Sequence, residues 1–304
     1  MEFSKMIRVG IVHGAQAFYP ELAAYRDFLT ADSDFVVRDY ESLKEADPNS
    51  DVILLFCGLF PFWKASRSKV IAEYHSLSTG RLPVLKNLLK RLLNIRGDHY
   101  LFLNEKVREH LFFSPTVSHD VRGMGFHKAL VEKNLNARKI FDFVYSGSTN
   151  RAGVHDAILK IASMGCTVAV VGNSEKDTLQ FKGPWSRNVE LFGRVDIDRS
   201  YEIMASARYG INYTIDKYPY YLQDSTKVIE YCALGLGVVT NRYEWVDHFE
   251  RRVGGKFLSF EGLSSKAAVD GFDFRAGDVD QYSWDSVLRA SNIKETVRRL
   301  SHRP

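Results

Sequence analysis

The chain contains few cysteines, and their number and placement exclude several classes of protein. Its 304 residues include three, Cys57, Cys166 and Cys232. An odd number of cysteines among apolar neighbours predicts buried free thiols in a reducing cytoplasm. No two of them have the spacing of zinc ligands, so we expect no metal site.

Long apolar runs are also absent from the sequence. No run reaches the roughly 18 residues that a membrane span requires, and residues 52–62 have the length of a buried strand with its loop. The first five residues (MEFSK) and the short apolar segment 9–12 do not have the architecture of a signal peptide. There is no internal repeat and no low-complexity segment. We therefore expect a cytoplasmic protein.

The net charge of +4 is too small to predict a nucleic-acid partner, but the basic residues are unevenly distributed. Residues 64–96 contain eight of them and a single acidic residue, Glu73. Within this stretch leucines occur at positions 82, 85, 88, 89, 92 and 93, which predicts a helix with one apolar and one basic face.

Two interpretations of this helix remain open. Its leucines could pack on a sheet while its lysines are solvated. Alternatively, the helix could lie on an anionic membrane surface, where each basic residue contributes roughly 1 kcal/mol. Phe60, Phe62 and Trp63, just before Lys64, would suit an interfacial position.

Apolar strands alternate with amphipathic helices in both halves of the chain. Strands are predicted at 8–12, 35–40, 51–56, 69–74, 99–103, 142–145, 166–171, 189–193, 209–213 and 237–240, and helices at 20–29, 82–93, 105–111, 154–164, 198–206 and 226–234. This alternation predicts an α/β fold with two doubly wound parallel sheets.

The less periodic stretch 114–138 separates the two halves. We therefore predict an N-terminal domain over residues 1–130 and a C-terminal domain over residues 131–304, and the last helix could pack back on the N-terminal domain. Ligands of parallel sheets bind beyond the carboxyl ends of the strands, so we expect the site in a cleft between the domains.

Residues 223–241 (QDSTKVIEYCALGLGVVTN) carry the strongest functional signal. Ser225 suits a helix N-cap, and Gly235 suits the left-handed residue after a helix. Lys227 would then lie in the first turn, where the helix dipole disfavours a cation unless an anion such as a diphosphate is bound. Glu230, one turn further on the same face, could accept hydrogen bonds from both ribose hydroxyls. A surface Lys–Glu pair would show the same spacing.

This stretch resembles the donor-site motif of GT-B glycosyltransferases, especially the large retaining family numbered 4. Three further blocks follow that family's order and spacing: 143–154 (FVYSGSTNRAGV), 168–173 (VAVVGN) and 188–195 (NVELFGRV). The resemblance implies two Rossmann-like domains that face each other across a cleft. The N-terminal domain would bind the acceptor, and the C-terminal domain would bind the nucleotide sugar.

The resemblance also implies roles for individual residues. Arg151 matches a basic residue, usually lysine, that contacts the donor phosphates, and Gly14 falls where backbone N–H groups approach the diphosphate. The expected donor-binding set is Gly14, Ser148, Arg151, Gly172, Asn173, Arg194, Asp224, Ser225, Thr226, Lys227 and Glu230. The expected catalytic set is His75, Arg151 and Lys227. No cofactor and no metal is expected besides the donor.

The segment 70–75 (VIAEYH) resembles the strand that ends in a histidine beside the donor sugar. His75 could contact the sugar or acceptor, or it could cap the strand end by hydrogen bonds. In an inverting enzyme a group with a pKa near the working pH must act as base, and Asp39, Glu73, His13 and His75 compete for that role.

The sequence departs from the family at one position. The family has two glutamates with seven residues between them; the second matches Glu230, and the first falls on Leu222. The first glutamate normally contacts the donor sugar, and Asp224 is close enough to replace it. A retaining outcome is still favoured over an inverting one.

Together these features predict a metal-independent glycosyltransferase. It would transfer a sugar from a nucleotide-diphospho-sugar to a glycan or a lipid-linked saccharide, in bacterial surface polysaccharide or glycoconjugate assembly. Two alternatives stay open: a non-catalytic nucleotide-sugar-binding partner subunit, and a nucleotide-sugar epimerase of the same fold. The expected location is the cytoplasm, with peripheral contact at the inner face of an anionic membrane, and no nucleic acid is expected as a partner.

Overall fold

A computed structural model describes residues 6–13, 20–56, 58–64, 66–173, 181 and 183–302. Gly14, expected to bind the donor, and Cys57 lie outside the described residues. By its internal contacts the chain divides into two units. Unit 1 comprises Met1–Met124, Leu222–Asp224 and Trp284–Pro304, and unit 2 comprises Gly125–Tyr221 and Ser225–Ser283. Residues 284–304 therefore belong by their contacts to unit 1. The sequence placed 131–304 in one domain and left open that the last helix packs back on the other.

Unit 1 contains a six-stranded parallel sheet in the order β2-β1-β3-β4-β5-β6. Its strands are β1 (Ile7–Val12), β2 (Phe35–Tyr40), β3 (Val52–Phe56), β4 (Lys69–Tyr74), β5 (His99–Phe102) and β6 (His119–Val121). The first five agree with the strands predicted from the sequence. β6 was not predicted, because its three residues carry no apolar pattern.

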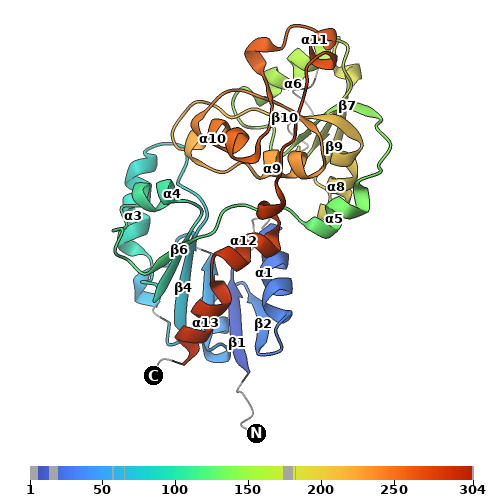
Figure 1. Ribbon diagram of the computed structural model, residues 1–304. Coiled ribbons are helices and arrows are strands. Elements are labelled where there is room, and N and C mark those ends of the chain that lie inside the picture. The colour runs from blue at the N-terminus through green and yellow to red at the C-terminus, as the bar shows by residue number, and fades with distance from the viewer. Residues whose placement is uncertain are drawn as a thin grey trace. The chain divides into compact units, whose positions relative to one another are not determined.

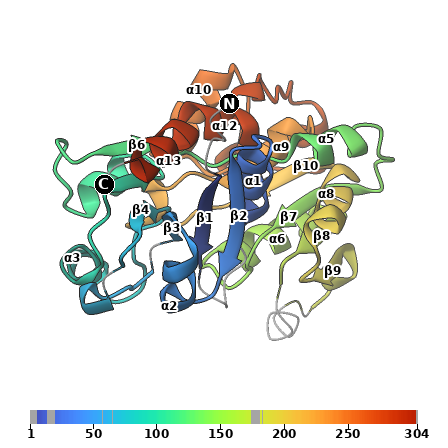
Figure 2. The same cartoon turned by 90° about the horizontal axis from the view of Figure 1, so that it is seen from below.

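The helices of unit 1 come from both ends of the chain. They are α1 (Pro20–Thr30), α2 (Leu43–Ala46), α3 (Pro83–Leu93), α4 (Glu105–His110), α12 (Trp284–Ala290) and α13 (Ile293–Ser301). Tyr25 and Leu29 of α1 share one buried cluster with Leu288 of α12 and with Val297 and Leu300 of α13. Figure 2 shows α1 and α13 on one side of the sheet and α2 on the other. The C-terminal helices thus complete the N-terminal core.

Unit 2 contains a second six-stranded parallel sheet, in the order β12-β11-β10-β7-β8-β9. Its strands are β7 (Phe141–Ser146), β8 (Val168–Val171), β9 (Val189–Gly193), β10 (Ala207–Asn212), β11 (Gly237–Thr240) and β12 (Leu258–Ser259). Counted along the chain and read from β9, this order is 3-2-1-4-5-6, the Rossmann order. The strand order reverses between β7 and β10, where such sheets bind ligands.

Helices cover both faces of the second sheet. They are α5 (Lys128–Asn134), α6 (Val154–Ser163), α8 (Ile197–Ala205), α9 (Thr226–Ala233), α10 (Glu244–Val253) and α11 (Lys266–Asp270), several of which are labelled in Figure 1. Ile158 and Ile161 of α6 pack against Phe143 and Val168. On α9, the ring of Tyr231 lies directly over Gly210 of β10, where a side chain would collide with it.

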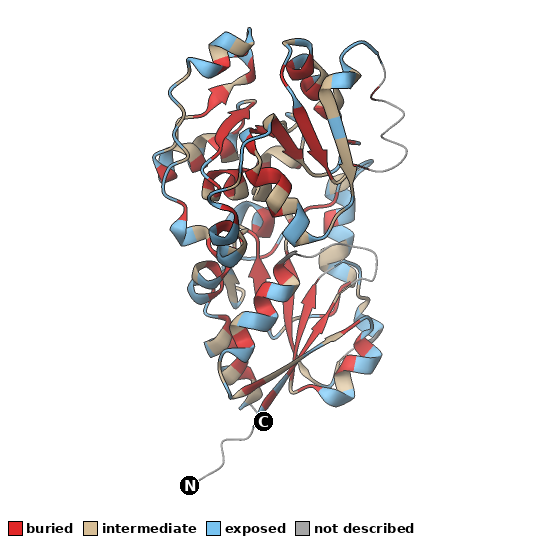
Figure 3. Cartoon of the chain, turned by 90° about the vertical axis from the view of Figure 1, so that its right-hand side faces the viewer, coloured by how far each residue is buried: buried red, intermediate tan, exposed pale blue. Residues whose placement is uncertain are grey.

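Several strands are buried along their whole length, as expected when helices cover both faces of a sheet. Every residue of β3, β8 and β11 is buried, and Figure 3 shows much of both sheets in red. Cys166 and Cys232 are buried free thiols, as predicted. No helix in the described ranges combines the length and the apolar character that a membrane span needs.

We predict that Gly210→Ala destabilises the protein by about 1–3 kcal/mol or more. An added Cβ would lie 2.2 Å from Cδ2 of Tyr231, a buried ring whose hydroxyl accepts a hydrogen bond from the Ser146 N–H. Urea unfolding measures the change. Gly58→Ala is the matched control, because its Cβ would meet nothing within 4 Å, and we expect an effect within about 0.5 kcal/mol. Equal stabilities of the two variants would contradict the prediction.

Candidate functional site

Two cations meet beyond the carboxyl ends of β7 and β10. β7 ends at Ser146, and the loop 147–153 that follows it carries Arg151. β10 ends at Asn212, and the next helix, α9, has Lys227 in its first turn. The exposed Arg151 guanidinium lies close enough to lower the pKa of Lys227. The structure thus brings together two residues predicted to contact the donor phosphates, at the point where the strand order reverses.

The Lys227 ammonium is held by an aromatic ring. Its Nζ lies 4.5 Å from the centroid of the Tyr145 ring and 3.4 Å from Tyr145 Oη, and the Tyr145 hydroxyl donates to the backbone oxygen of Ser148 at 3.0 Å. Burial and then the Arg151 charge lower the pKa of Lys227 to about 7, although Glu230 acts in the opposite direction. A bound anion would favour the charged form and raise this pKa again.

Glu230 is held by a different partner. The Tyr201 hydroxyl donates to Glu230 Oε1 at 3.1 Å and accepts the His127 N–H at 3.1 Å. Burial raises the pKa of Glu230 to about 7, against the effects of Tyr201 and Lys227, which lower it. Lys227 and Glu230 are therefore not a solvated surface pair, the alternative that their spacing allowed. Each is half-buried and positioned by a tyrosine.

The N-terminus of α9 differs from the capping expected from the sequence. Ser225 occupies the N-cap position but makes no side-chain cap hydrogen bond. Its hydroxyl donates instead to Asn212 Oδ1 at 3.1 Å, while Asn212 Nδ2 donates to Thr240 Oγ1 and to Tyr243 Oη. The Ser225 side chain therefore does not cap the backbone N–H groups of the first turn, which remain available to another acceptor. Gly235 has φ +68°, as predicted for the residue after the helix.

The loops after β7, β8 and β9 are tied together closely. Gly172 has φ +91°, and a Cβ there would lie 3.1 Å from the backbone oxygen of Gly147. Asn173 Oδ1 accepts the Gly193 N–H at 2.9 Å, and the exposed Arg194 follows directly. The predicted residues Gly172 and Asn173 thus have a structural role here. Their contact with a donor stays a prediction, as does that of Arg194.

Asp224 and Leu222 belong by their contacts to unit 1. The Asn104 side-chain amide donates to Leu222 O at 3.1 Å and to Asp224 Oδ1 at 2.9 Å. The Leu222 side chain is buried. A leucine offers no hydrogen bond to a sugar hydroxyl, so Leu222 cannot make the sugar contact that the resemblance predicts for a glutamate at this position. Whether Asp224 replaces it stays a prediction.

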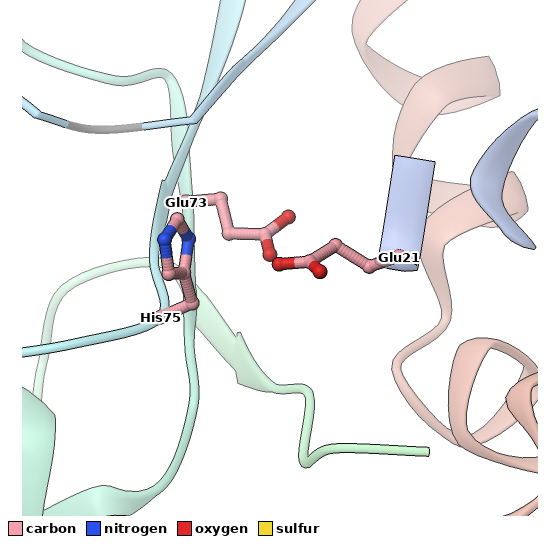
Figure 4. Close-up of side chains that lie close together, drawn as sticks. All are labelled: Glu21, Glu73 and His75. Atoms are coloured by element: carbon pink, nitrogen blue, oxygen red, sulfur yellow. The ribbon is translucent and has the colours of Figure 1, made fainter. Parts of the chain in front are cut away.

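Unit 1 contains a buried charged cluster beside His75. Glu21 of α1, Glu73 of β4 and His75 place their polar atoms within 4.8 Å of one another, as Figure 4 shows. The Arg122 guanidinium pairs with Glu73 and lies 3.8 Å from Glu21, and the Tyr25 hydroxyl donates to Glu73 at 2.8 Å. Carboxylates and a histidine could hold a cation, but here Arg122 already supplies a positive charge.

The cluster affects the protonation of its members. Against the effect of burial, Glu73 holds the pKa of Arg122 above its usual value, so the guanidinium stays charged. Burial lowers the pKa of His75, which favours a neutral imidazole. Of the four candidate bases, Glu73 is paired with Arg122 and Asp39 with Arg26. The role of base stays a prediction for all four residues.

Several residues around these sites carry no functional signal in the sequence. Tyr145 and Tyr201, which hold Lys227 and Glu230, look like ordinary core aromatics in the sequence. Thr149, in the loop of Arg151, is 2% exposed, and within the described part of the chain its hydroxyl has no hydrogen-bond partner. Arg122 carried no signal, because a single arginine in an irregular stretch is usually on the surface.

The two parallel sheets and their covering helices form the GT-B fold of glycosyltransferases. Among solved structures, the chain is similar to AviGT4, a glycosyltransferase involved in avilamycin A biosynthesis, with a TM-score of 0.65 and 14% identity over 97% of this chain and 98% of that one. It is also similar to WaaG, a glycosyltransferase involved in lipopolysaccharide biosynthesis, with a TM-score of 0.54 and 13% identity over 97% and 93%. At these sequence identities the similarity shows a shared fold alone.

No protein-family model matches the sequence. A comparison with curated proteins also found no match.

We predict that Arg122→Met destabilises the protein by about 3–5 kcal/mol, because it leaves buried carboxylates without their cation. Arg122, Glu73 and Glu21 are all at most 3% exposed. Urea unfolding at pH 7 measures the loss. The double variant Arg122→Met/Glu73→Gln should recover part of it, because the buried charge is then also removed.

The control is Arg26→Met, which breaks the partly exposed pair with Asp39. We expect a cost of about 0–1 kcal/mol for that variant. An equally small effect of Arg122→Met would show that the buried cluster does not support the fold.

Proposed function

We propose that the protein is a glycosyltransferase that uses a nucleotide-diphospho-sugar as donor. One observation supports this most strongly: Arg151 and Lys227 lie close together where the strand order of a Rossmann-type sheet reverses. Two neighbouring cations repel each other, and burial penalises Lys227 further. A diphosphate bound there would relieve both effects, and the free N–H groups at the start of α9 suit the same anion.

In the proposed mechanism, the diphosphate is the leaving group. Negative charge grows on it as the bond to the sugar breaks, and Arg151, Lys227 and the α9 dipole stabilise that charge. Removal of one such contact typically costs about 2.7–4 kcal/mol of transition-state stabilisation. Glu230, positioned by Tyr201, accepts hydrogen bonds from the ribose hydroxyls. We propose that these charges take the place of a divalent metal.

The acceptor is proposed to be a glycan or a lipid-linked saccharide, in bacterial surface polysaccharide or glycoconjugate assembly. Unit 1 would bind this acceptor, and His75 would contact the sugar. The proposed location of the protein is the cytoplasm. Retention is favoured by the resemblance in residues 223–241, and the buried Leu222 weakens that support. If the enzyme inverts, His75 or His13 would act as base, because Glu73 and Asp39 are held in ion pairs.

Leu222 also favours a second candidate function, a non-catalytic nucleotide-sugar-binding subunit. A thermal-shift screen against nucleotide sugars would identify the donor, because a ligand that binds the folded protein raises its stability by mass action. Calorimetric binding without transfer or hydrolysis would support the non-catalytic subunit. A new nucleotide sugar formed without acceptor would instead support an epimerase.

We predict that Arg151→Ala and Glu230→Ala each lower kcat/KM by about 100-fold or more, since each removes a contact to the charged donor. Radiolabelled sugar transfer measures the loss, and urea unfolding should show little change. Arg252→Ala and Glu190→Ala, which remove exposed side chains of the same types in unit 2, are the controls and should keep full activity. Wild-type rates in both site variants would overturn the proposed function.

We also predict that donor affinity is greatest near pH 7. The free site holds Lys227 and Glu230 with pKa values of about 7. Above pH 7 free Lys227 loses its proton and must regain it to bind the diphosphate. Below pH 7 free Glu230 gains a proton and must lose it to accept from ribose. Both steps weaken binding, so donor affinity falls above and below pH 7.

Calorimetry with a nucleotide-diphospho-sugar between pH 5.5 and about pH 9 tests this dependence. Lys227→Met should remove the decline above neutrality, and Glu230→Gln the decline below it. An affinity that does not change with pH would show that neither side chain contacts the donor.

A further inference from the structure

The helix α3 is oriented with its apolar face outward. Its one buried residue is Asn87, whose side-chain oxygen accepts the Ser78 N–H at 2.8 Å. On the opposite face Leu85 and Leu92 are 49% and 60% exposed. The interpretation in which the leucines pack on the sheet is therefore wrong. A polar amide anchors the helix to unit 1, and the leucines face away from it.

A second segment extends this apolar face. Residues 59–63 run beside the end of α3, where the Ile95 N–H donates to Phe60 O at 2.8 Å and Phe60 N–H to Asn94 Oδ1 at 2.9 Å. Together the two segments form what we call the leucine surface. It consists of Leu59, Phe62, Trp63, Leu82, Val84, Leu85, Leu88, Leu89 and Leu92, all of them exposed. Soluble proteins rarely expose so many large apolar side chains together unless the surface binds something.

Basic residues are interspersed in the sequence with the residues of the leucine surface. Arg67, Arg81, Lys86 and Arg96 are exposed in residues 64–96. The single acidic residue of that stretch, Glu73, is 1% exposed and paired with Arg122. Every exposed charge contributed by this stretch is therefore positive. Apolar side chains flanked by cations are typical of helices that lie in the interface of an anionic membrane.

We propose that the leucine surface docks on an anionic lipid membrane, with α3 parallel to the membrane plane and Phe62 and Trp63 at the headgroup level. Aromatic side chains favour that level. A second copy of the chain fits less well, because a two-fold interface sets equivalent patches face to face and would bring like charges together. The inference concerns binding alone and does not depend on the proposed transferase activity.

The first experiment uses the full chain and vesicles of phosphatidylcholine with or without phosphatidylglycerol. We expect co-sedimentation with the anionic vesicles at low salt and a strong reduction at high salt, because salt screens exposed charges. Trp63 is 65% exposed, so its fluorescence should shift to the blue on binding and be quenched by brominated lipid. Absence of binding to anionic vesicles at low salt would overturn the proposal.

Matched variants locate the contact. Leu85→Gln/Leu92→Gln should weaken vesicle binding at least tenfold. Leu135→Gln/Ile140→Gln should leave it unchanged, although Leu135 and Ile140 are 58% and 60% exposed. Arg81→Glu/Lys86→Glu should weaken binding by about 25-fold or more, since each basic residue near an anionic surface contributes about fivefold. Circular dichroism confirms that each variant folds.

Two results would count against the leucine surface as a membrane contact. If Leu135→Gln/Ile140→Gln weakened vesicle binding as much as Leu85→Gln/Leu92→Gln does, the binding would not be specific to the leucine surface. Self-association in sedimentation velocity that Leu85→Gln/Leu92→Gln abolishes would instead assign the surface to a second copy of the chain.

Discussion

The burial of Lys227 beside a second cation is the constraint on which the proposed donor site depends. The ammonium lies against the Tyr145 ring, and burial and Arg151 both favour its neutral form. Close packing maintains this arrangement, because Tyr231 of the same helix lies directly over Gly210 and the loops of Gly147 and Gly172 touch. The positive charges of such a site are uncompensated until an anion binds. A diphosphate would compensate them, which favours its selective binding.

The buried arginine of unit 1 shows the opposite arrangement. Arg122 is 1% exposed, but Glu73 and Glu21 neutralise it within the fold. A compensated charge stabilises the native packing, and an uncompensated one stores free energy that a ligand can release. This difference explains why we assign Arg122 a structural role and Lys227 a functional one, although both are cations held near tyrosines.

Apolar side chains of the amphipathic helices also differ in their environment. Leu288 and Leu300 of the C-terminal helices are buried against the first sheet, whereas the leucines of α3 are exposed. All three helices are amphipathic, and their amphipathic pattern does not say which face meets the sheet. On α3 the hydrogen bond of Asn87 decides which face packs on unit 1, because a buried amide needs a partner and the Ser78 N–H provides one. The exposed leucines then require a different apolar environment.

The sequence by itself determined the strand–helix alternation and most strand positions, because apolar periodicity is a local signal. It also singled out Lys227 and Glu230 by their spacing and Arg151 by a resemblance to a known family. It did not reveal β6, since a strand of three residues leaves no apolar pattern, and it left open whether the last helix packs back on the N-terminal domain. Only the tertiary structure decided which side chains surround Lys227, Glu230 and Arg122, and which face of α3 is exposed. Those environments are made by residues far apart in the chain, and they set the pKa values and the burial on which the proposed functions rest.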